Sequence, residues 1–348
     1  MRTAARGWAT ESWWIRSSSI ALLVLTVSSG LLAVLGAPTA GASPPPTGML
    51  TATHPSARWS GAMVYDAKDG YSLLFGGGNR SALLNDTWAF RNGTWTQLFP
   101  PVSPPVRGSA SIAYDPVAGY VLLFGGNNPV TTFGDTWKFS GGNWTPLGLH
   151  YGPSARFGAS MVYDARDHYF VLFGGNDPAG KLLNDTWIFV HGHWKHVHPA
   201  VSPPPRRAAG MAYDASDGYV VLFGGLSFGD ANDTWTYFRG NWTHVNATVA
   251  PGVRVAPSMV YDKALGEIVL FGGRDDNSQT LWGDTWTFHA GNWTQLAPAH
   301  SPSGRDGASA AFDTRAHRIV MFGGASTPYA PVSVDSGTWL FNGLNWRR

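Results

Sequence analysis

Apolar residues recur in short runs along this chain, and sets of four runs repeat about every fifty residues. In the third copy the runs are Gly158 to Tyr163, Tyr169 to Phe173, Thr186 to Val190 and Trp194 to Val197. Gly, Asp and Asn stand between them, and these residues favour turns. Each copy is therefore predicted to form four short antiparallel strands.

Four landmarks mark each copy: an aromatic-Asp pair, a run ending in Phe-Gly-Gly, Asp-Thr-Trp, and an isolated Trp. The Phe of Phe-Gly-Gly is followed by its next counterpart after 49, 49, 50, 48 and 51 residues. Its six occurrences are Phe75, Phe124, Phe173, Phe223, Phe271 and Phe322. A long fixed period indicates an array in which each copy is one supersecondary unit.

Six such sheets arranged radially predict an all-β, six-bladed propeller with four antiparallel strands per blade. The blades are placed at residues 55–98, 105–147, 153–197, 205–245, 251–296 and 303–348. The first run of each copy is small, as in Ser60-Gly61-Ala62 and Gly307-Ala308-Ser309. Blades converge on the axis, so the innermost strand needs small side chains, whereas large ones such as Trp88 and Trp95 fill the wider gaps farther out.

The residues at these landmarks, and their order, resemble the kelch repeat over residues 55–348. This resemblance implies a kelch-type β-propeller, the fold also found in the catalytic domain of galactose oxidase and in bacterial sialic acid epimerase. The sixth copy departs from the pattern, with Phe312 in place of Tyr and Ser336-Gly337 in place of Asn-Asp or Gly-Asp. A galactose-oxidase-like copper radical is excluded, because that cofactor uses a cysteine and the chain has none. We expect no cofactor and no metal.

The N-terminal residues have the pattern of an export signal. Arg2, Arg6 and Arg16 precede an apolar stretch from Ile20 to Gly36, and Ala40-Gly41-Ala42 follows. A basic start, an apolar middle and a small-x-small site predict a signal peptide, residues 1–42, cleaved after Ala42. An uncleaved membrane anchor is the alternative. Both predict a secreted or cell-surface protein. Residues 43–54 are a linker, or residues 47–53 supply a strand that closes the last blade.

Composition narrows the classes of partner. Removing residues 1–42 would leave 21 basic and 21 acidic residues, a balance that argues against general nucleic-acid binding. Without cysteine, the protein has no thiol nucleophile and no disulfide, so stability must come from the core and from closure of the ring. We expect a monomer, with membrane contact only if the N-terminal segment is retained.

An arginine stands seven residues before each aromatic-Asp pair, at the entrance of the predicted innermost strand. The set is Arg58, Arg107, Arg156, Arg206, Arg254 and Arg305. Neighbouring guanidinium groups about 8–10 Å apart would repel each other by about 0.4–2 kcal/mol per pair, so something must compensate. One interpretation pairs each arginine with the Asp of Asp-Thr-Trp and leaves one charge over in the sixth copy. The other is a cationic collar that binds the carboxylates of an acidic peptide or anionic sugar.

The loops between the second and third strands lie at the same end as these arginines and differ most between copies. Varied loops on one face of a scaffold are where binding usually resides. The candidate ligand contacts in them are Arg80, Asn127, Asp177, Phe228, Arg274, Asp275, Trp282 and Tyr329. The Asp of the aromatic-Asp pairs lies at the opposite end, where it is predicted to build a turn.

These observations predict a protein- or glycan-binding module that holds its ligand on the arginine-bearing face, without catalytic residues. Neither Gly-x-Ser-x-Gly nor His-Glu-x-x-His occurs. One alternative is a sugar epimerase or mutarotase resembling the sialic acid enzyme. Its acid and base would come from Asp177, Asp230, Asp275 and Asp276. A second alternative is a structural surface protein.

Overall fold

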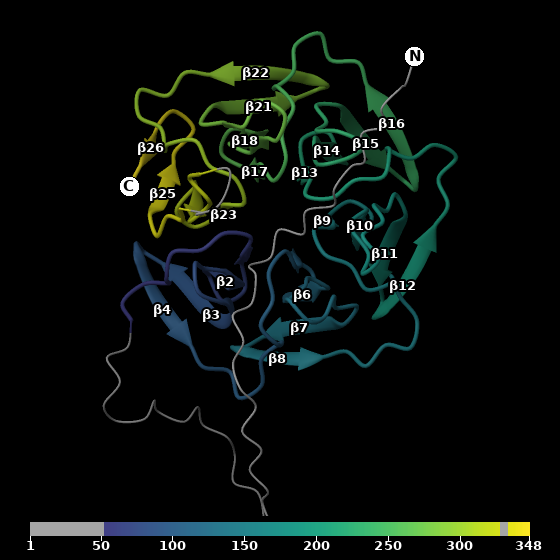
Figure 1. Ribbon diagram of the computed structural model, residues 1–348, viewed down its shortest axis with the longest axis vertical. Coiled ribbons are helices and arrows are strands. Elements are labelled where there is room, and N and C mark those ends of the chain that lie inside the picture. The colour runs from purple at the N-terminus through teal and green to yellow at the C-terminus, as the bar shows by residue number, and fades with distance from the viewer. Residues whose placement is uncertain (1–51, 328–332) are drawn as a thin grey trace, which may run out of the picture. The chain divides into compact units, whose positions relative to one another are not determined.

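The computed structural model describes residues 52–327 and 333–348. Residues 1–42, the segment 47–51 and Tyr329 lie outside these ranges, so the predictions made for them concern residues that are not described. The repeats belong to one compact unit, Pro45–Arg348. Within it, six sheets of four antiparallel strands surround a common axis (Figure 1), which confirms the all-β, six-bladed propeller. In the described part of the chain, no helix is long and apolar enough to cross a membrane.

The strands follow chain order from the axis outward in every blade. Blade 1 contains β1 (Ala62–Asp66), β2 (Tyr71–Gly78), β3 (Leu83–Arg91) and β4 (Thr94–Leu98). Blade 2 contains β5 (Ser111–Asp115), β6 (Tyr120–Phe124), β7 (Thr136–Ser140) and β8 (Asn143–Pro146). Blade 3 contains β9 (Ser160–Asp164), β10 (Tyr169–Phe173), β11 (Thr186–Val190) and β12 (His193–Val197).

The second half of the ring has the same order. Blade 4 contains β13 (Gly210–Asp214), β14 (Tyr219–Phe223), β15 (Thr234–Phe238) and β16 (Asn241–Val245). Blade 5 contains β17 (Ser258–Asp262), β18 (Glu267–Phe271), β21 (Thr285–His289) and β22 (Asn292–Leu296), with the small hairpin β19 (Arg274–Asp275) and β20 (Thr280–Leu281) inserted. Blade 6 contains β23 (Ser309–Asp313), β24 (Arg318–Phe322), β25 (Thr338–Phe341) and β26 (Trp346–Arg347). Blade 6 thus takes its outer strand from the end of the chain, and the described residues 52 and 53 are in no strand.

A ring of backbone hydrogen bonds encircles the axis just before the innermost strands. In each blade, the residue two positions after the repeated arginine donates its N–H to the carbonyl of its counterpart in the preceding blade, at 2.7–3.0 Å. The ring residues are Ser60, Ser109, Gly158, Ala208, Ala256 and Gly307. Ser60 donates to Gly307 at 2.8 Å, so the ring includes the junction between blades 6 and 1.

All six ring residues have φ between 51° and 63°, in the left-handed region. That conformation is costly for residues other than glycine, and four of the six are Ser or Ala. It also explains why β9 begins at Ser160, two residues later than predicted, because Gly158 has φ 63° and cannot continue the strand.

Each interface between blades is packed by an indole from a fourth strand. Trp144 of β8 contacts the ring of Phe75 in blade 1 at 5.1 Å between centroids, and its Nε1–H donates to Thr87 Oγ1 at 3.0 Å. Equivalent Trp–Thr bonds of 2.8–3.0 Å occur at all six interfaces. The bond from Trp95 to Thr338 closes blade 1 onto blade 6. The prediction that tryptophans fill the gaps between blades is confirmed.

The innermost strands surround a central cavity of about 190 Å³ that is open to solvent. Small residues line it at the narrowest radius, among them Gly61, Ala110, Ala159, Ala209 and Ala308. Ser309 Oγ also donates to the carbonyl of Gly61 across the junction of blades 6 and 1, at 2.8 Å. Small side chains therefore lie at the axis, as the repeat pattern predicted.

Candidate binding site on the loop face

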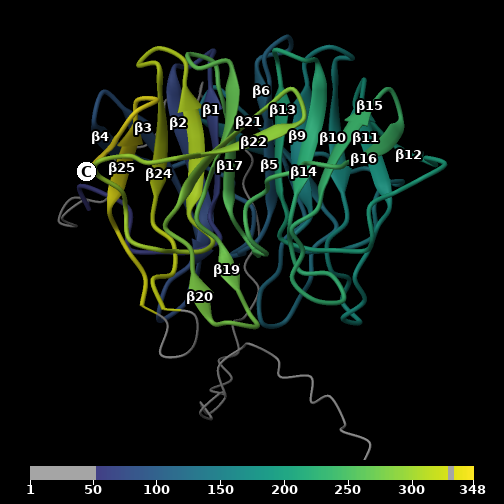
Figure 2. The same ribbon diagram turned by 90° about the horizontal axis from the view of Figure 1, so that it is seen from above.

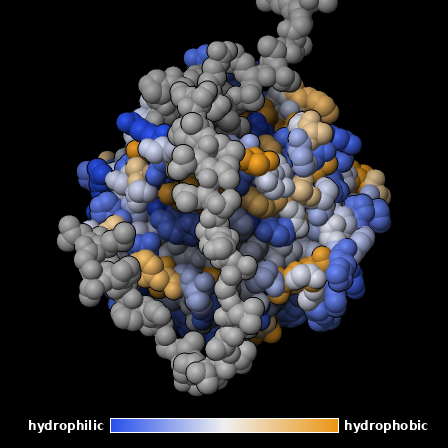
Figure 3. Space-filling model, turned by 60° about the horizontal axis from the view of Figure 1, so that its bottom comes forward, coloured by the Kyte–Doolittle hydropathy of each residue, from blue (hydrophilic) through white to orange (hydrophobic). Residues whose placement is uncertain are grey.

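The loop face is the end of the propeller where the second strand of each blade connects to the third. In the side view of Figure 2 it lies at the bottom, where the hairpin of β19 and β20 projects. Figure 3 shows hydrophobic residues scattered among hydrophilic ones over the visible, ungreyed surface. Of the exposed apolar side chains, Val130 and Phe228 lie in these loops and are 91% and 90% exposed.

The six repeated arginines are buried on this face, each 0–2% exposed. Arg156 represents them: Nη1 and Nη2 donate to the two oxygens of Asp185 at 2.6 and 2.8 Å, and Nη1 also donates to the carbonyl of Gly174 at 3.0 Å. Burial raises the pKa of Asp185, but the hydrogen bonds and the charge of Arg156 outweigh it and leave that pKa below its ordinary value. These contacts match the first of the two interpretations, in which each arginine pairs with the Asp of Asp-Thr-Trp.

The same bidentate pair occurs in blades 1 to 5. Its members are Arg58–Asp86, Arg107–Asp135, Arg156–Asp185, Arg206–Asp233 and Arg254–Asp284. The guanidinium groups are thus occupied by carboxylates and carbonyls of the protein itself. A ligand would have to displace those partners to reach them, so the cationic collar is not an open surface in this structure.

The expectation of an unpaired charge in blade 6 is wrong. Asp335, two positions before the glycine that aligns with the usual Asp, accepts a hydrogen bond from Arg305 Nη1 at 2.9 Å. In blade 3 the indole N–H of Trp187 also donates to the paired Asp185, at 2.7 Å. The shifted position of Asp335 leaves the equivalent Trp339 Nε1 buried without a hydrogen-bond partner. Blade 6 therefore keeps the charge balance but loses part of the hydrogen-bond network.

The predicted loop contacts differ in their exposure to solvent. Phe228 and Arg80 are exposed, whereas Trp282 is half-buried, with its ring centroid 5.0 Å from the guanidinium carbon of Arg254. Asn127 is only 5% exposed, its Oδ1 is buried without a hydrogen-bond partner, and its backbone forms isolated bridges to two other segments. Asp177 accepts hydrogen bonds from N–H groups of its own turn. Tyr329 lies outside the described residues.

Charged residues from blades 4, 5 and 6 meet on the loop face in a group that we call the Asp306 cluster. Its members are Asp230, Arg274, Asp275, Asp276 and Asp306. The guanidinium of Arg274 bridges Asp276 and Asp306, and the backbone N–H of Asp276 donates to the side chain of Asp230. This arrangement occurs once and is not part of the sixfold pattern.

Asp306 is the most perturbed carboxyl of the cluster. It is 6% exposed, and its Oδ1 is buried without a hydrogen-bond partner. Burial raises its pKa to about 6, although the positive charge of Arg274 opposes the shift. Burial also raises the pKa of Asp230. Arg207 lies close enough for burial and the charge of Arg274 to lower its pKa.

Sequence reasoning identified Arg274 and three carboxylates of this cluster but missed Asp306 and Arg207. A signal for both exists in the position directly after each repeated arginine. Its occupants are Trp59, Gly108, Phe157, Arg207, Val255 and Asp306. Because this position varies while the arginine before it is repeated, each blade carries a different side chain at the same place on the loop face. Asp177, also proposed as an acid or base, is not joined to the cluster by the contacts described here.

Comparison with models of known protein families and with curated protein sequences finds no match. The fold and the geometry of the loop face are therefore the basis for any functional conclusion.

Proposed function

We propose that this protein is an exported, kelch-type propeller that binds a protein or carbohydrate ligand on its loop face. The kelch assignment rests on the registered landmarks of residues 55–348, and export rests on the signal-like residues 1–42. The observation that carries the binding proposal is the Asp306 cluster, a charged group that the repeat does not require. Ligand contacts come from the loops, and the repeated arginines hold the scaffold.

The state of Asp306 supports a binding role. A buried acceptor without a partner is unfavourable by about 1–3 kcal/mol, so such a group in a native protein calls for an explanation. Because this Oδ1 is itself buried, it would accept a hydrogen bond from a hydroxyl or N–H of a ligand once the loop that carries Arg274 moves away from it. The exposed Phe228 stands two residues before Asp230 and adds an aromatic surface, a residue type enriched in interfaces.

The test is a screen of the purified protein on peptide and glycan arrays, followed by titration of the best ligand. Asp306→Asn and Phe228→Ser are each expected to weaken binding at least about tenfold, the loss of one good contact. Asp177→Asn is the matched control on the same face, and it should bind normally. Full affinity in both test variants, or no ligand in the screen, would contradict the proposal. The second result would favour a structural surface role.

One observation favours a second function, a sugar epimerase or mutarotase. A general acid or base is most effective when its pKa lies near the working pH, and Asp306 has a pKa of about 6 beside the raised pKa of Asp230. NMR of anionic sugars would detect faster anomer interconversion, or exchange of a carbon-bound proton, in the presence of enzyme. Loss of that rate in Asp306→Asn, with binding retained, would establish the catalytic role.

A further inference from the structure

The opposite end of the propeller, the turn face, carries a group of side chains that the binding function does not use. In each blade the Asp of the aromatic-Asp pair supports the first turn. In blade 4, Asp214 Oδ1 accepts the N–H of Ser216 at 2.9 Å and that of Asp217 at 3.3 Å. These bonds leave the second oxygen, Oδ2, for another partner.

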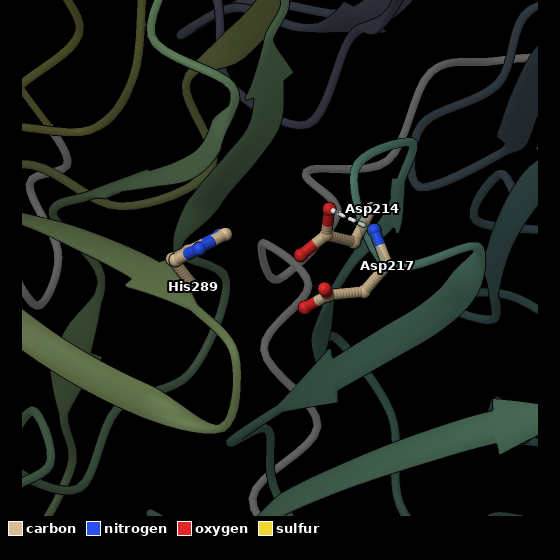
Figure 4. A group of neighbouring side chains, drawn as sticks. All are labelled: Asp214, Asp217 and His289. Atoms are coloured by element: carbon tan, nitrogen blue, oxygen red, sulfur yellow. Dashed lines mark hydrogen bonds between the residues drawn. The ribbon is translucent and has the colours of Figure 1, made fainter.

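Three potential metal ligands meet here at the interface of blades 4 and 5. One ligand atom from each of Asp214, Asp217 and His289 lies within 4.8 Å of the other two. Figure 4 shows the imidazole ring of His289, at the end of β21, facing the two carboxylates of the turn between β13 and β14. Asp214 is fully buried, at 0% exposed, and its Oδ2 has no hydrogen-bond partner. That oxygen lies on the side of the carboxylate that faces His289 (Figure 4).

From this geometry we propose that Asp214, Asp217 and His289 bind a divalent transition-metal ion, with Zn²⁺ the best match. Two carboxylate oxygens and one imidazole nitrogen are a donor set that suits zinc. His289 is exposed, so water has access to the remaining coordination position. A buried carboxylate oxygen without a partner is stabilised by a cation more than by any neutral donor.

The surroundings hold the ligands in place. Asp217 Oδ2 accepts the hydroxyl of Tyr219 at 2.6 Å and the backbone N–H of Ala290 at 3.1 Å. Ala290 directly follows His289, so this bond ties the histidine-bearing segment of blade 5 to the carboxylate of blade 4. Hydrogen bonds of this kind orient metal ligands and raise affinity.

Comparison with the other blades shows why this interface differs. The position of His289 is held elsewhere by Arg91, Ser140, Val190, Phe238 and Asn342. Asp262 in blade 5 also has a buried Oδ2 without a partner, and His317 is near enough to influence its charge. There, however, Leu265 occupies the position of Asp217, so only two ligands are present. The bound ion would link two adjacent blades in a chain that has no disulfides.

The test is isothermal titration of the purified protein with ZnCl₂, combined with thermal unfolding. His196 and His198, whose rings lie 4.1 Å apart, are replaced by alanine throughout because they can bind zinc adventitiously. We expect one equivalent of Zn²⁺ to bind. At a hundredfold excess over Kd it should raise the Tm by about 5 °C. MgCl₂ should have no such effect, since Mg²⁺ prefers six oxygen ligands.

His289→Ala is expected to lower zinc affinity at least about tenfold and to remove the Tm shift, because it removes one of three ligands. His317→Ala is the matched control, an exposed histidine beside a buried aspartate with only two ligands, and it should behave as the parent. Asp217→Asn provides a second test on the carboxylate side. Unchanged zinc binding in His289→Ala would overturn the proposal. So would a parent protein that binds no zinc and loses stability on the same substitution, because that result indicates a simple imidazolium–carboxylate pair.

Discussion

The loop face contains two kinds of arginine–carboxylate contact. The Arg156–Asp185 pair has a counterpart in every blade, and nearly all of its polar atoms are bonded within the protein. The Arg274–Asp306 contact occurs once, joins loops of two blades, and leaves an oxygen of Asp306 without a partner. Where the copies agree, the charges maintain the ring. In the unrepeated contact, a buried carboxylate oxygen of Asp306 stays without a hydrogen-bond partner.

Arg156→Met tests the repeated contact and should have the largest effect. The substitution removes five hydrogen bonds and leaves Asp185 without its partner, so we expect a loss of about 3–5 kcal/mol in the free energy of unfolding. Urea unfolding followed by tryptophan fluorescence measures it. Arg166→Met, at an exposed arginine of the same blade, should cost less than about 1 kcal/mol. Equal effects of the two variants would show that the buried pair has no special role.

Asp306→Asn tests the unrepeated contact through its pH dependence. The unfolded carboxyl loses its proton near its ordinary pKa of 3.8, whereas the folded one keeps it up to about 6. Folding therefore becomes less favourable as the pH rises through this window. Asparagine has no such proton, so between pH 4 and 7 the variant should gain about 2.4 kcal/mol relative to the parent. Urea unfolding at four pH values gives this difference, with Asp177→Asn as control. A constant difference would place the pKa of Asp306 near its ordinary value.

Blade 6 offers a smaller test within the repeated set. Asp185 accepts two bonds from Arg156 and one from Trp187, whereas Asp335 accepts one from Arg305, one from the backbone N–H of Gly337 and none from Trp339. Asp335→Asn should therefore destabilise the protein by about 1–2 kcal/mol less than Asp185→Asn. Parallel chemical unfolding of the two variants measures the difference. Equal losses of unfolding free energy would mean that Asp335 stabilises the protein as much as the bidentate partner Asp185 does.

Most of the fold could be predicted from sequence because each blade repeats the same local pattern of strand-forming and turn-forming residues. Tyr169 to Phe173 and Thr186 to Val190 form strands with the predicted bounds, since β-forming residues and turn residues alternate clearly there. Small residues at the axis and tryptophans between blades follow from the radial geometry alone. The start of β9 could not be predicted, because the left-handed conformation of Gly158 comes from a bond between blades.

The sites were predicted less completely because they depend on contacts between loops of different blades. The position of Asp335 does not align with the acids that it replaces, so its pairing with Arg305 depends on the path of one loop. Burial of Asp306 requires the loop of blade 5 to cover it. His289 follows Asp214 by 75 residues, and nothing local in either copy indicates that the two side chains meet.

The six backbone amides that bond head to tail around the axis form a circle without a first or last member. Omitting one blade would leave a donor and an acceptor facing each other across a gap too wide to bridge. An open solenoid tolerates the loss of a terminal repeat because each repeat contacts only its neighbours. A closed circle has no terminal repeat to lose. We therefore expect the six blades to melt together, as a single cooperative unit.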